Sequence, residues 1–170
     1  YYEEKRYIID QRTDIEGKQT TDMKTWTRSM FYNKIIEYAN ASLTDSNTLR
    51  QIPTTQYAIL VELGKDSRQL QPSLFHFLAY RKIEMLKEIE QNSNYGYMSS
   101  DERNKNENNL NNEMLNTYNQ IIAFDREQKN LPALVYTELQ KLNYTNPSKD
   151  EQYLSALNAL EKANTGNEAV

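Results

Sequence analysis

Residues 74–91 read LFHFLAYRKIEMLKEIEQ and follow Pro72-Ser73. Apolar side chains recur in this stretch every three or four positions, which is the spacing of one face of an α-helix. Ser73 is a typical N-cap residue, so the sequence predicts a helix that begins directly after it. The side chains expected to face the core are Leu74, Phe77, Leu78, Ile83, Leu86 and Ile89.

The same spacing predicts further helices on both sides of this one. Residues 1–12 are expected to turn Tyr2, Ile8 and Ile9 inward, and a second helix is expected from Asp22 to residue 41, with Asp22 as its cap. The other expected helices lie at 54–63, 110–122, 131–142 and after the Ser148–Glu151 capping box, where residues 153–160 are periodic.

These elements predict an all-α fold, because no segment alternates with the period of two that a strand requires. The four glycines and four prolines lie between the periodic runs, which is typical of helices joined by loops. We expect an irregular stack of antiparallel helical hairpins with six or seven helices and no substantial β-sheet. We also expect residues 1–170 to form one domain, which is a fragment of a much larger multidomain polypeptide.

Composition excludes several classes of function. The chain has 20 Lys and Arg against 24 Asp and Glu, a net charge of −4, which argues against a nucleic-acid partner. The absence of Cys excludes disulfides and thiolate metal sites, and the isolated glycines form no phosphate-binding loop. No apolar run approaches the ~20 residues of a transmembrane helix. We therefore expect no cofactor, no metal ion and no transmembrane segment in this chain.

His76 is the single histidine and the obvious candidate for chemistry. A metal site around it would need carboxylates for all its other ligands, and a Ser-His-Asp set is conceivable only around this residue. The nearest serine, Ser73, is better used as a helix cap. We interpret His76 as a residue at a helix end that bonds its neighbours, and we expect no catalytic residue in this chain. Glu84 with Glu88 and Asp125 with Glu127 are candidate acid pairs, but Glu84 and Glu88 share one helix face and lie among basic residues, so we interpret these carboxylates as part of a solvated surface.

Tyrosine is unusually frequent, with 13 residues. Tyr95 and Tyr97, together with Trp26, are candidates for stacking on a sugar or for an interaction surface, since a tyrosine ring combines a large apolar body with a polar tip. The alternative is that tyrosine replaces phenylalanine in a partly wet core.

The densest motif is Leu70-Gln71-Pro72-Ser73-Leu74-Phe75-His76-Phe77-Leu78-Ala79-Tyr80-Arg81. With landmarks such as Tyr1-Tyr2, Thr25-Trp26 and Ile52-Pro53, it resembles the N-terminal helical region of bacterial alpha-2-macroglobulin-like proteins, where this place looks like L-R-P-T-L-Y-D-F-L-A-H-R. The family pattern has Asp and His where this chain has His76 and Tyr80. We interpret these two residues as a structural polar pair with exchanged roles.

The resemblance implies a role in protease trapping. Such proteins are large endopeptidase inhibitors of the cell envelope, periplasmic or at the outer surface, in which an internal Cys–Gln thioester can capture the attacking protease. This chain has no Cys and carries no thioester. It is expected to be a non-catalytic structural and interaction module, whose partners are other domains of the same polypeptide and, through that parent, proteases.

A different class of function is also compatible with the sequence. A free-standing helical-repeat protein would bind glycan or peptide through exposed tyrosines such as Tyr95 and Tyr97. A groove lined by apolar residues and exposed tyrosine would favour this binder. A broad apolar patch near one terminus would favour the module of a larger protein.

Overall fold

The computed structural model describes residues 1–12, 21–60, 64, 66–93 and 100–164. These residues form eight α-helices and two 3₁₀ turns, and their one β-type pairing is an isolated bridge between Pro53 and Ser73. The predicted all-α stack is therefore confirmed. The helices number eight among the described residues because two short ones, α3 (Ser46–Gln51) and α4 (Ser67–Leu70), form in the connections.

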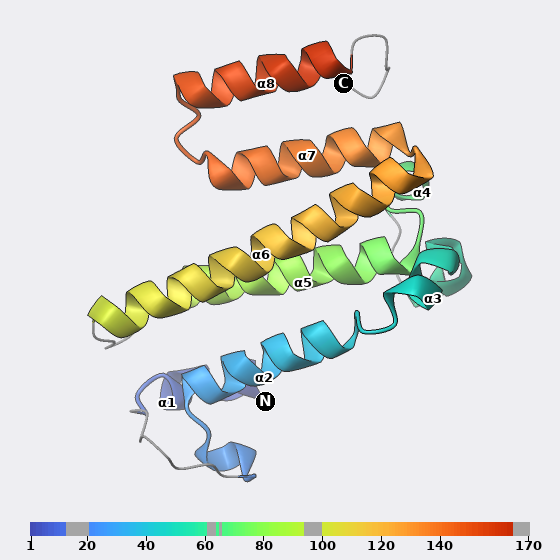
Figure 1. The fold of residues 1–170 in the computed structure, drawn as a ribbon. Coiled ribbons are helices and arrows are strands. Elements are labelled where there is room, and N and C mark those ends of the chain that lie inside the picture. Colours follow the sequence, from blue (N-terminus) through green and yellow to red (C-terminus); the bar gives the residue numbers. More distant parts are fainter. Residues whose placement is uncertain (13–20, 61–63, 65, 94–99, 165–170) are drawn as a thin grey trace.

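Five longer helices lie side by side and give the molecule its shape (Figure 1). Each contacts the next one in the stack, and consecutive members run in opposite directions. In their order through the stack they are α2 (Arg28–Ala41), α5 (Leu74–Ser93), α6 (Ser100–Gln128), α7 (Leu131–Thr145) and α8 (Glu151–Ala163). The short helix α3 packs on α5, and α4 packs on α7.

The core lies between α5 and α6. One cluster of buried side chains occupies the end of this interface nearest the start of α5, and a second continues along it. The first cluster comprises Leu43, Phe75, Ala79, Ile83, Tyr118, Ile121 and Phe124, and the second comprises Leu86, Ile89, Leu110 and Met114. Burial of such side chains supplies the main driving force for folding, about 25 cal/mol for each Å² removed from water.

The buried face of α5 differs at its first turns from the face that the sequence predicts. Phe75 and Ala79 are buried, whereas Leu74, Phe77 and Leu78 are only half-buried. The difference arises because the run LFHFL is apolar on all sides, so that local spacing leaves the inward direction undetermined.

The N-terminal helix α1 (Tyr2–Ile9) ends earlier than predicted and turns a different side inward. Ile9 is fully buried, but Ile8 is exposed, so the prediction that both face the core is wrong for Ile8. Adjacent residues on a helix diverge by about 100°, and the two isoleucines cannot share one narrow contact.

The helix predicted from Asp22 to residue 41 is divided in two. Asp22 caps only a 3₁₀ turn, η1 (Met23–Thr25), and Trp26 then takes an extended conformation. Helix α2 begins two residues later, with the Thr27 hydroxyl accepting a hydrogen bond from the Met30 N–H at 3.5 Å.

The helix predicted at 54–63 is wrong for the described residues, where only a 3₁₀ turn, η2 (Thr54–Tyr57), forms. Leu60, expected to follow the apolar face of that helix, is 81% exposed. The chain instead pairs with the entry to α5. The Thr54 N–H donates to Pro72 O at 2.9 Å and its hydroxyl donates to Gln71 O at 2.7 Å. This pairing holds the start of α5 in place.

The C-terminal hairpin begins as the sequence predicts. Asn130 caps α7, accepting a hydrogen bond from the Ala133 N–H at 3.4 Å. Helix α8 is capped by Asp150 rather than by the predicted Ser148–Glu151 box, because Lys149 adopts a left-handed conformation (φ 49°) that ends the turn one residue before Asp150. Helix α8 is anchored to α7 by the buried Tyr153, whose hydroxyl donates to Asn143 Oδ1 at 2.9 Å.

Candidate functional site

The candidate residues from the sequence fall in two places. Tyr95 and Tyr97 lie outside the described residues, so the structure places neither of them. His76 and Tyr80 lie one turn apart on α5, near its N-terminus.

His76 closes the first turn of α5. Its Nδ1 atom lies 2.7 Å from the Ser73 hydroxyl and accepts a hydrogen bond from the Ser73 N–H at 3.4 Å. This bond is one half of a capping box, with His76 in the position that Glu or Gln usually occupies. A backbone N–H can only donate, so Nδ1 acts as an acceptor, and we assign the ring hydrogen to Nε2.

The other ring nitrogen bonds across the helix interface to α6. His76 Nε2 donates to Asp125 Oδ1 at 2.9 Å. The side chains of both residues are 1% exposed. The neutral imidazole therefore provides a donor for a carboxylate that has been removed from water, a burial that is costly without such a partner.

Tyr80 joins the same network through α7. The Thr137 hydroxyl donates to the Ala133 carbonyl at 2.8 Å and lies 3.5 Å from Asp125 Oδ2. Because its single hydrogen is used in this way, the Thr137 hydroxyl accepts from the Tyr80 hydroxyl at 2.6 Å. Burial raises the pKa of Tyr80. His76 and Tyr80 thus belong to one buried network, and Asp125 and Thr137 connect them.

This network brings together the Ser, His and Asp types of a hydrolase triad, but not the order in which a hydrolase uses them. In the triad of a serine protease the carboxylate orients Nδ1 and the serine faces Nε2. Here Asp125 faces Nε2 and Ser73 faces Nδ1 from the same helical turn. Ser73 is 5% exposed, so no substrate carbonyl can reach its hydroxyl without local opening.

Sequence reasoning identified His76 and Ser73 but missed Thr137. It interpreted Asp125 as part of an acid pair on a solvated surface, which is wrong, because Asp125 is fully buried. The signal for Asp125 was available, because this acidic residue follows Tyr118 and Ile121 at helical spacing and therefore lies on the apolar stripe of α6. A carboxylate in that position requires a buried partner.

Arg50 covers one side of the same region. Its guanidinium lies 5.0 Å from the ring centroid of Phe75 and 4.8 Å from that of Phe124. Such stacking of a cation on aromatic rings is favourable by about 0.5–2 kcal/mol. Its Nε atom is buried with no hydrogen-bond partner, and its Nη1 atom lies 4.0 Å from the Glu127 carboxylate, which is largely exposed.

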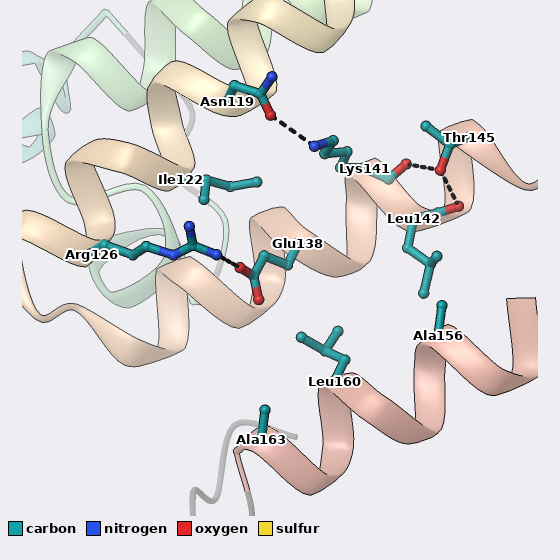
Figure 2. Close-up of a pocket in the computed structure, with 10 residues that line it drawn as sticks. All are labelled: Asn119, Ile122, Arg126, Glu138, Lys141, Leu142, Thr145, Ala156, Leu160 and Ala163. Atoms are coloured by element: carbon teal, nitrogen blue, oxygen red, sulfur yellow. Dashed lines mark hydrogen bonds and ion pairs between the residues drawn. The ribbon is translucent and has the colours of Figure 1, made fainter.

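An open groove lies on a different surface, along the C-terminal helices (Figure 2). Helix α7 forms its floor, while α6 and α8 form its two walls. Its volume is about 460 Å³, within the ~300–1,000 Å³ range of ligand pockets. The groove is lined by Asn119, Ile122, Arg126, Glu138, Lys141, Leu142, Thr145, Ala156, Leu160 and Ala163, none of which is a tyrosine.

The polar side chains of the groove connect α6 to α7. Arg126 and Glu138 form an ion pair at 2.5 Å, and Lys141 donates to the Asn119 side-chain oxygen at 2.8 Å. Lys141 is thus paired with a neutral amide, whereas Arg126 is paired with a charge. Figure 2 shows these pairs on one side of the groove and the apolar side chains of α8 on the other.

Comparison with known proteins yields no relative: no family model, curated protein or solved structure matches this chain. The resemblance to alpha-2-macroglobulin-like proteins therefore stays a prediction. Within the described part of the chain, no helix has the length and apolar character needed to cross a membrane.

Proposed function

We propose that this domain is a non-catalytic structural and interaction module of a larger, alpha-2-macroglobulin-like protein of the cell envelope, one that traps proteases. Its contact surface is the groove between α6, α7 and α8. The observation that carries the proposal is the contrast between two sites. The side chains of the types that catalysis uses, Ser73, His76 and Asp125, are buried in the core, whereas the groove is open and partly apolar.

The packing of α8 supports an interaction role. This helix is anchored mainly to α7, and its residues Ala156 and Leu160 remain only half-buried at the groove. Leu154, on another side of the helix, is 54% exposed. Apolar surface left at the end of a helical stack favours contact with another protein surface.

The non-catalytic part of the proposal is tested with a fluorophosphonate, which labels activated serine hydroxyls. We expect the mass of the intact protein to stay unchanged after incubation, because the Ser73 hydroxyl is buried. Labelling that disappears in Ser73→Ala, while the fold measured by circular dichroism is retained, would show that the protein is an enzyme.

The parent protein is tested by its size. An antibody raised against the purified domain should detect a very large band on a denaturing gel of native envelope extract. A band near 20.0 kDa, the mass of this chain, would contradict the macroglobulin assignment.

The groove is tested by lysine labelling with an N-hydroxysuccinimide ester, followed by mass spectrometry. Lys141 lines the groove and Lys5 lies exposed on α1, away from it. We expect Lys141 to be labelled more slowly in the native polypeptide than in the isolated domain, relative to Lys5. Equal relative rates in the two forms would remove the groove from the proposal.

A further inference from the structure

We propose that the groove between α6, α7 and α8 binds an amphipathic α-helix of another domain of the parent polypeptide, with acidic residues beside its apolar stripe. This inference rests on the proposed function, because it names the kind of partner that the same groove takes. It is argued from the shape, the apolar lining and the charge of the groove.

The shape of the groove fits a helix. On α6 the lining residues run from Asn119 to Arg126, and on α7 from Glu138 to Thr145, a rise of seven residues in each case. At ~1.5 Å per residue the groove is about 10 Å long, or two helical turns. Walls made of helix surfaces offer ridges between which another helix can pack, whereas β-strand addition needs the free edge of a sheet.

The apolar lining is arranged for one face of such a helix. Ile122, Leu142 and Leu160 contribute one large side chain from each of the three helices, and they surround the groove. Ala156 and Ala163 lie on α8 two turns apart, and their small side chains let a partner backbone approach this wall. The partner is therefore expected to present small and medium apolar residues at positions i, i+3, i+4 and i+7.

The charge of the groove favours acidic side chains beside the apolar stripe of the partner helix. Arg126 and Lys141 supply two cations, and Glu138 supplies the single carboxylate among the lining residues, so the groove is positive although the chain has a net charge of −4. Glu138 is occupied by Arg126, and Lys141 bonds only a neutral amide. An acidic side chain on the partner would complement Lys141, whereas a basic one would be repelled.

The test uses two synthetic peptides of about 15 residues, the length at which Ala-rich helices begin to be stable. Both carry Leu and Ala on one face and are closed by the same side-chain lactam, but one has Glu and its twin has Lys along the flank. Binding to the domain is measured by fluorescence anisotropy at low ionic strength, because a higher salt concentration screens the contact.

We expect the Glu peptide to bind at least about tenfold more tightly than the Lys peptide, an energy difference of about 1.4 kcal/mol. Lys141→Glu should reverse this preference, while Lys5→Glu, which changes the net charge equally on remote α1, should leave it unchanged. Leu160→Asp should weaken binding of both peptides at least about tenfold, since it places a charge in the apolar wall. Circular dichroism checks that each variant is folded.

Equal affinities for the two peptides, no binding of either one, or a preference unaffected by Lys141→Glu would each overturn this inference. Lysine labelling separates its failure from that of the proposed function. If Lys141 is protected in the native polypeptide but the Glu peptide shows no preference, the groove is an interface for a different partner and only this inference fails.

Discussion

The bond between His76 and Asp125 should be measurable as an asymmetric loss of stability. Because His76 Nε2 donates to the Asp125 carboxylate, the two single variants leave different groups behind. His76→Ala leaves the fully buried Asp125 carboxylate without its donor, which costs about 3–5 kcal/mol when a charge is stranded in a core. Asp125→Ala leaves an uncharged N–H unpaired, which costs about 1–3 kcal/mol.

The double variant completes a thermodynamic cycle. With both side chains removed, neither group is stranded, so the loss should fall short of the sum of the two single losses by about 0.5–3 kcal/mol. All four proteins are compared by urea unfolding at neutral pH, followed by circular dichroism, and an unchanged dependence on urea confirms that a common unfolded state is compared.

Two results would refute this reasoning. Additive losses would show that the 2.9 Å bond contributes nothing. A larger loss for Asp125→Ala than for His76→Ala would show that the assigned charge distribution is wrong. If His76→Ala does not fold, His76→Gln keeps an amide donor directed at Asp125 and should fall between the wild type and Asp125→Ala.

Three further predictions concern other parts of the fold. Thr54→Val should lower the free energy of unfolding by about 1–3 kcal/mol, because the Gln71 carbonyl loses its 2.7 Å donor, and Thr54→Ser should lower it less, as urea unfolding would show. Glu113→Ala should lower the free energy of unfolding more than Lys82→Met, because it leaves the Lys82 ammonium unpaired at a 5% exposed position, whereas Lys82→Met removes the buried charge. Equal losses of stability would contradict this. The hydrogen bond from the Tyr153 N–H is the main cause that lowers the pKa of Asp150. The stabilisation of α8 by this cap should therefore be complete above the pKa of the unfolded state, about 3.9, and be lost as the pH falls through the lower pKa of the folded state. Hydrogen exchange in α8 should show this loss, and Asp150→Asn should abolish the pH dependence.

Local rules predicted the helices where one signal fixes an end. Asn130 gives a cap, Pro132 in the first turn gives a preset backbone angle, and α7 begins at Leu131. The rules failed where distant contacts compete with local spacing. The apolar run after Thr54 has helical periodicity, but Thr54 donates its hydrogen bonds to residues 71 and 72, which lie far away in the sequence. Among the described residues 54–60 only a 3₁₀ turn forms.

The same distinction explains what could be known of the candidate site. The bond between Ser73 and His76 is local, three residues apart, and a capping interpretation of these two side chains was within reach of the sequence. The partners Asp125 and Thr137 come from α6 and α7, and only the register of three packed helices brings them to the ring. An isolated polar residue in an apolar stripe therefore predicts that a buried partner exists but does not say which one. Ser73 and Asp125 hold the His76 ring inside the core, whereas the groove along α7 lies open at the surface.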